Sequence, residues 1–112
     1  MKLRQLAETL NLTVKAGDRG LDAEVTGAYA ADLLSCAMAG ARKGNLWLTL
    51  QGHLNVVAIA SLAELAGIVV TEDKPVTVDT IAKADEEGIP ILITSLSTFG
   101  LAGRLWELGV RD

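Results

Sequence analysis

Polar residues suited to binding a ligand follow each of three apolar runs in the second half of the chain. These residues are Gln51, His53, Asn55, Thr71, Ser95 and Ser97. Imidazole, amide and hydroxyl groups at the start of a helix donate hydrogen bonds to anions, which the helix dipole also favours. If each run is a parallel strand leading into a helix, the turns lie beyond the carboxyl ends of the strands, where open α/β sheets bind ligands. We therefore expect a candidate site for a nucleotide or another phosphate-bearing molecule at this edge.

His53 is the only histidine of the chain, and two interpretations of its turn remain open. In one, His53 donates to an anion at the start of the following helix. In the other, Gln51, His53 and Asn55 only close the turn, with Asn55 as the helix N-cap. Capping accounts for Asn55 but gives no reason for His53.

The hydroxyl groups before the last helix have a similar choice of roles. Ser97 or Thr98 suits an N-cap, whereas a serine nucleophile would need a positioned base, for which His53 is the only histidine available. No Gly-x-Ser-x-Gly elbow surrounds these residues, so capping is the favoured interpretation. We expect no catalytic residues.

The acidic and cysteine residues do not suggest a metal site. Glu72 and Asp73 follow a predicted strand, but they are interpreted as a solvated loop closed by Pro75. Cys36 is the single cysteine, which excludes a multi-cysteine site, and we expect it to be a small buried hydrophobe. We therefore expect neither a metal nor a cofactor.

Composition narrows the class of protein. The chain has 112 residues, half of them hydrophobic, and a net charge of −4. An acidic chain without a basic run is poorly suited to nucleic acid, and no apolar run approaches the roughly 20 residues of a membrane span. The charged first ten residues do not form a secretory signal. We expect a cytoplasmic protein that binds neither nucleic acid nor membrane.

Apolar periodicity predicts the elements that position the candidate residues. The predicted extended segments are 12–14, 26–31, 46–51, 67–71 and 90–94. The predicted helices are 3–10, 33–39, 55–65, 78–87 and 98–108. The expected fold is α/β, a small three-layer domain over residues 1–112 in which a short parallel β-sheet is flanked by helices.

Two of these helices have more apolar surface than one sheet face needs. The helix at 55–65 is hydrophobic on nearly every side, and the helix at 98–108 has a second stripe with Phe99, Ala102 and Trp106. A helix that is hydrophobic all round must be buried on two faces. We therefore expect a homodimer in which this surplus surface forms the interface.

The helix at 78–87 is one-sided. The residues expected to face the sheet are Val78, Ile81, Ala82 and Ala84. Gly88 is placed to end this helix as a left-handed cap.

A second cluster of candidate residues lies in the first half of the chain. Thr26 and Gly27 occur in an extended run, where Gly27 allows a bulge or the close approach of another backbone. Asp32 can cap the helix that starts near Leu33.

The segments 24–35 and 47–55 resemble the small stand-alone proteins of the DRTGG-domain family, and the similarity continues from Gly88 to the carboxyl terminus. The family takes its name from an Asp-Arg-Thr-Gly-Gly signature. This chain keeps Thr26 and Gly27 of the signature, and the resemblance alone gives these two residues a candidate ligand role. The other three signature positions are occupied by Glu24, Val25 and Ala28.

The resemblance implies a domain like the non-catalytic amino-terminal domain of HPr kinase/phosphorylase, which contributes regulation and subunit contacts. Some stand-alone members sit beside genes for iron-only hydrogenases, which implies a hydrogenase-related protein partner. Members are often labelled serine kinases, but this chain has no Gly-x-x-x-x-Gly-Lys-Ser/Thr segment to hold phosphates. The expected function is a non-catalytic regulatory or interaction module. The alternative is a small-ligand sensor at the strand ends.

Overall fold

A single five-stranded sheet forms the centre of the computed structural model, which describes residues 1–111. The strand order is β1-β5-β4-β3-β2; β2 to β5 are parallel, and β1 runs antiparallel to β5 at one edge. The strands are β1 (Thr13–Ala16), β2 (Gly27–Ala30), β3 (Asn45–Thr49), β4 (Gly67–Val70) and β5 (Ile91–Ile93).

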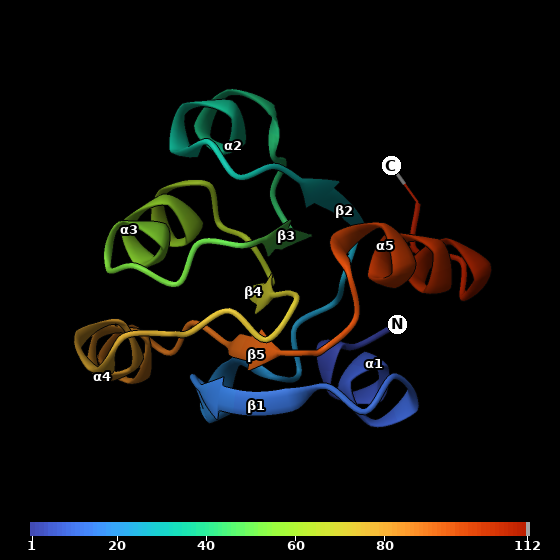
Figure 1. Ribbon diagram of the computed structural model, residues 1–112, viewed down its shortest axis with the longest axis horizontal. Helices are drawn as coiled ribbons and strands as arrows, with labels where there is room; N and C mark the ends of the chain where they lie inside the picture. The colour runs from blue at the N-terminus through green and yellow to red at the C-terminus, as the bar shows by residue number, and fades with distance from the viewer. Residues whose placement is uncertain (112) are drawn as a thin grey trace.

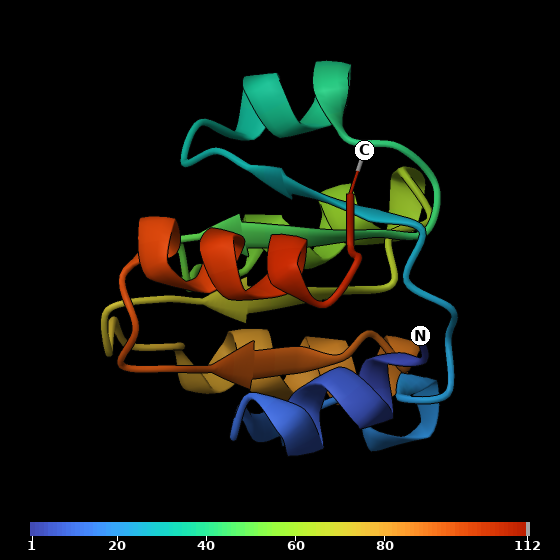
Figure 2. The same cartoon turned by 90° about the vertical axis from the view of Figure 1, so that its right-hand side faces the viewer.

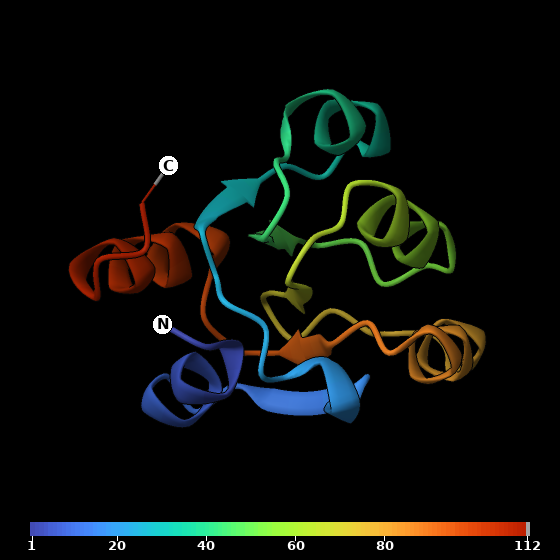
Figure 3. The ribbon, with the colours of Figure 1, turned by 180° about the vertical axis from the view of Figure 1, so that it is seen from behind.

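Helices cover both faces of the sheet. The helices are α1 (Leu3–Thr9), α2 (Leu34–Gly40), α3 (Asn55–Leu62), α4 (Val78–Glu87) and α5 (Thr98–Glu107). Figures 1 and 3 show α2, α3 and α4 on one face and α1 and α5 on the other. The expected three-layer α/β fold with a short, mostly parallel sheet is therefore confirmed.

Alternate residues of the central strands fill two separate cores. Leu48 and Val69 belong to the core under α1 and α5, whereas Trp47, Ile68 and Val70 belong to the core under α2, α3 and α4. Because both faces are covered, residues 46–48 of β3, 68–70 of β4 and 91–93 of β5 are apolar runs without polar alternation. Trp47 is fully buried, and its indole N–H donates to the Ala31 carbonyl over 2.8 Å.

Residues in the left-handed conformation follow the ends of α3 and α4. α3 ends at Leu62 rather than at residue 65, because Glu64 has φ 55° and the Leu65 N–H bonds back to the Ala60 carbonyl over 2.9 Å. The expected left-handed cap of α4 at Gly88 is confirmed, with φ 69°.

The predicted sheet-facing side of α4 is partly wrong. Thr80 and Ala84 are the buried residues of this helix, whereas Val78 is 84% exposed and Ala82 is exposed. Val78 is the first helical residue, so it lies at the open end of α4 and beyond the region where the helix packs. The polar Thr80 takes the inward position because its hydroxyl bonds to that of Thr77 over 2.6 Å.

The strand connections create one topological switch point. In Figure 2 the carboxyl ends of the parallel strands all point to the left, and the chain leaves them from that side. β3 and β4 lead into α3 and α4 on one face, whereas β5 leads into α5 on the other. β4 and β5 are neighbours, so their connections diverge between them, which is where open α/β sheets form a crevice.

Within residues 1–111, no helix has the length and apolar character needed to cross a bilayer.

The turn after β3 requires a glycine for steric reasons. A Cβ atom at residue 52 would overlap the Pro75 carbonyl oxygen, and the Gly52 carbonyl accepts from the Thr77 N–H over 3.1 Å.

We expect Gly52→Ala to destabilise the protein by about 3 kcal/mol through overpacking. Urea unfolding measures this loss. Ser61→Ala, at an exposed position of α3, serves as the control and should change stability by less than about 0.5 kcal/mol. Equal effects of the two substitutions would contradict the close approach.

Candidate functional site

Threonines at the carboxyl ends of β3 and β4 bond within the fold. Thr71 is fully buried, and its hydroxyl lies 2.7 Å from that of Thr98 and 3.4 Å from the Thr49 carbonyl oxygen. The Thr49 hydroxyl donates to the Asp32 carboxylate over 3.3 Å. The predicted site residue Thr71 therefore joins β3, β4 and α5 and presents no free hydroxyl.

The two predicted serines have different surroundings. Ser97 is the N-cap of α5, and its hydroxyl oxygen accepts from the Gly100 N–H over 3.0 Å, so the expected capping is confirmed. Ser95 is exposed, and its side chain lines a hollow beside the end of β5.

The turn with Gln51, His53 and Asn55 is more open, but Asn55 does not cap α3. Leu54 precedes the helix in a right-handed helical conformation and gives no side-chain cap. The Val56 N–H already bonds to the His53 carbonyl over 3.1 Å, so the helical path begins before Asn55 and places it inside the first turn. The predicted N-cap role of Asn55 is therefore wrong. His53 and Asn55 are exposed, and Gln51 is half-buried.

Asp79, at the start of α4, is an acidic neighbour of this turn. The pKa of Asp79 is lowered, first by the hydrogen bond that the Thr77 hydroxyl donates over 2.6 Å, then by backbone N–H groups, and least by the charge of His53. The Asp79 carboxylate also accepts from the Thr80 N–H over 3.0 Å. An anion approaching His53 would meet this carboxylate, which disfavours phosphate at this turn.

Thr26 and Gly27 lie at the amino end of β2, whereas the other predicted site residues follow the carboxyl ends of their strands. The two groups are therefore at opposite ends of the parallel strands (Figure 2). The Thr26 hydroxyl donates to the Lys43 carbonyl over 2.9 Å and accepts from the Asn45 amide over 3.4 Å. A Cβ at Gly27 would lie 2.9 Å from the Arg111 carbonyl oxygen, so the expected close approach of another backbone is confirmed. The eight predicted site residues therefore do not converge on one site.

Two further expectations in the first half are wrong. Asp32 does not cap α2; its carboxylate accepts from the Leu50 N–H over 2.8 Å and ties the end of β3 to the end of β2. Cys36 is exposed on α2 rather than buried. Ala37, one residue further, takes the buried position of that turn.

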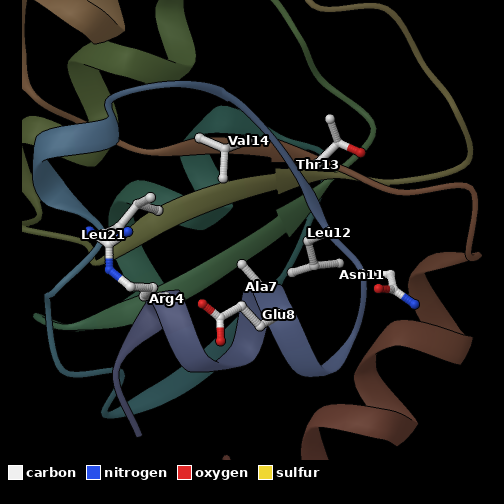
Figure 4. A pocket seen from close by; sticks show the side chains of 8 residues that line it. All are labelled: Arg4, Ala7, Glu8, Asn11, Leu12, Thr13, Val14 and Leu21. Carbon is white, nitrogen blue, oxygen red and sulfur yellow. The ribbon is translucent and has the colours of Figure 1, made fainter.

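Several hollows mark the surface. A hollow of about 450 Å³ lies between α1 and β1 (Figure 4). Arg4 lies at its rim, but its guanidinium is paired with Asp22 over 3.0 Å, which lowers the pKa of that carboxyl. A second hollow, of about 740 Å³, is lined by Thr26, Tyr29, Arg42 and Lys43 at the amino ends of β2 and β3.

The hollow lined by Ser95 is the one at the topological switch point. Its volume is about 350 Å³, and it joins the end of β5, the start of β1 and the side of α5. Its polar lining residues are Asn11, Thr13, Asp73, Thr94, Ser95 and Arg104. Sequence reasoning found only Ser95, because the others come from three separate loops and the middle of a helix. Within residues 1–111, no three histidine, cysteine or acidic side chains are grouped to hold a metal ion.

We expect the pKa of Asp79 to rise toward its ordinary value of about 3.9 when Thr77→Val removes the donated hydrogen bond. His53→Gln should raise it less, because the charge of His53 is the smaller cause. Carbon-13 NMR titration of the carboxyl group measures both shifts. Since the folded pKa is depressed, the stabilisation is present at neutral pH and is lost as the pH falls below about 4. A larger rise in His53→Gln than in Thr77→Val would contradict this assignment.

No protein-family model matches the chain, and no curated protein matches it.

Proposed function

We propose that this protein is a non-catalytic interaction module of the DRTGG type that forms a homodimer through α5. The observation that carries the proposal is the exposure of two aromatic side chains on this helix. Phe99 is 89% exposed and Trp106 is 54% exposed. Large aromatics on a surface lose hydrophobic free energy unless a partner covers them, and paired exposed aromatics are typical of contact sites.

The two aromatics lie on one stripe of α5. Phe99, Ala102 and Trp106 are spaced by three and four residues and therefore share a helix face. Gly103 lies beside them, and a Cβ there would meet no atom of this chain within 4 Å. A glycine inside a helix costs about 1 kcal/mol relative to alanine. The close approach of a second helix gives this glycine a structural purpose.

The apolar stripe of α5 can pair with the same stripe of a second copy. If two copies of α5 pair antiparallel about a two-fold axis between Ala102 and Gly103, Phe99 of each copy lies opposite Trp106 of the other. Such an isologous contact is the commonest form of protein dimer. Beside Trp106, a hollow of about 140 Å³ between β2 and α5 gives the opposing phenyl ring a place to insert. The guanidinium of Arg111 lies at its rim, 5.0 Å from the centre of the Trp106 ring. The other lining residues are apolar: Ala28, Ala30, Leu48, Ala102, Leu105 and Val110.

The surroundings of the candidate site residues favour an interaction module over a phosphate sensor or an enzyme. The hydroxyls of Thr71, Ser97 and Thr98 are hydrogen-bonded within the fold. A serine nucleophile would need His53, the only histidine, as its base, and within residues 1–111 no hydrogen bond joins the His53 side chain to Ser95 or Ser97.

Sedimentation equilibrium at micromolar concentration tests the dimer. We expect wild type to be dimeric, and Phe99→Ser and Trp106→Ser each to weaken the dimer at least tenfold, because each removes a central apolar contact. Val78→Ser is the matched control: Val78 is also highly exposed, but it lies on α4, on the other side of the sheet. A monomeric wild type, or equal weakening by Val78→Ser, would contradict the proposal.

A further inference from the structure

We propose that the hollow beside β5 binds a small zwitterion that carries one carboxylate and one ammonium group, of which a free α-amino acid is the simplest. This zwitterion site lies where the connections of β4 and β5 diverge, and its volume of about 350 Å³ suits a molecule of that size. It is independent of the proposed dimer contact.

Two opposite charges line the zwitterion site without pairing with each other. Arg104 comes from α5, and Asp73 comes from the loop after β4. Within residues 1–111, neither side chain has an ion pair within 4.0 Å or a hydrogen bond to another residue. A guanidinium binds a carboxylate through two parallel hydrogen bonds, and a carboxylate accepts from an ammonium. A ligand with both groups would satisfy Arg104 and Asp73 together.

Neutral polar groups complete the lining. The side chains of Asn11, Thr13 and Ser95 bond to no other residue among 1–111, and all three line this hollow. Asn11 and Thr13 also border the hollow between α1 and β1 (Figure 4). The Thr94 hydroxyl accepts from the Leu96 N–H over 3.2 Å, which leaves its own O–H free to donate. Leu10, Ile93 and Leu96 supply an apolar part of the wall, against which a ligand side chain can pack.

The backbone holds Asp73 in a costly conformation. Glu72 and Asp73 have φ values of 59° and 54°, although neither is glycine. The Glu72 N–H donates to the Leu96 carbonyl over 2.9 Å, and the Asp73 N–H donates to the Thr94 carbonyl over 3.1 Å. Non-glycine residues in this region cost about 1 kcal/mol or more each and are found at ligand-binding sites. These bonds hold the backbone of Asp73 beside Thr94 and Leu96, which line the same hollow.

The pairing of charges selects the ligand class. A phosphate or a simple carboxylate would contact Arg104 but would be repelled by Asp73, and a simple cation would have the reverse difficulty. The larger hollow at the amino ends of β2 and β3 is a weaker candidate. Its Lys43 is already paired with Glu64 over 3.4 Å, and the Thr26 hydroxyl is used within the fold.

The test is a nitrogen-15 NMR titration with each of the twenty standard L-amino acids, on the Phe99→Ser variant so that dimerisation does not interfere. Acetate and ethylammonium are the two single-charge probes. We expect at least one amino acid to shift the amide signals of Asn11, Asp73 and Ser95, and both single-charge probes to bind at least tenfold more weakly.

Two charge-removing variants test the two ends of the ligand. Arg104→Gln and Asp73→Asn should each weaken amino-acid binding at least tenfold while keeping dispersed spectra, because both side chains are exposed and unpaired within residues 1–111. Lys74→Gln is the control, since Lys74 is an exposed neighbour of Asp73 that does not line the site. The proposal is wrong if no amino acid shifts these signals, if acetate binds as tightly as the amino acid, or if Asp73→Asn leaves the affinity unchanged.

Discussion

The burial of β3, β4 and β5 between two layers of helices is the constraint on which the rest of the structure depends. Nearly every side chain of these strands is committed to one of two apolar cores. A polar group inside a core costs free energy unless it is hydrogen-bonded. The polar side chains of these strands, Asn45 and Thr49, accordingly lie at strand ends. Beyond the ends, the fold either bonds polar side chains to one another or leaves them to water and ligands.

The structure uses both solutions along the same edge. At the ends of β3 and β4, Asp32, Thr49, Thr71 and Thr98 bond in series and close the sheet. Next to them, β5 leads to the opposite face, and the chain opens into a hollow with unpaired side chains of both charges. The divergence of two neighbouring connections thus separates a closed part of the edge from an open part. We propose that a ligand binds at the open part and that two copies meet through the outer face of α5.

The sequence predicts those parts of this arrangement that depend on neighbours along the chain. The apolar runs identify the parallel strands, Ser97 caps α5, and Gly88 ends α4, because each of these features is local. Asn55 and Cys36 were mispredicted, because the onset of a helix and the direction of its faces depend on packing. The zwitterion site was missed for the same reason: its residues range from Leu10 to Arg104 and meet only after folding.

The position of β1 has a consequence for the order of folding. β1 pairs only with β5, and Thr13 lies opposite Ile93, so the first strand of the chain is held by the last. Contacts between residues so far apart in sequence slow folding, because a long loop must close before they form. During synthesis, β1 has no strand to pair with until β5 has emerged from the ribosome. Completion of the sheet, and with it the wall contributed by Asn11 and Thr13, is therefore a late event.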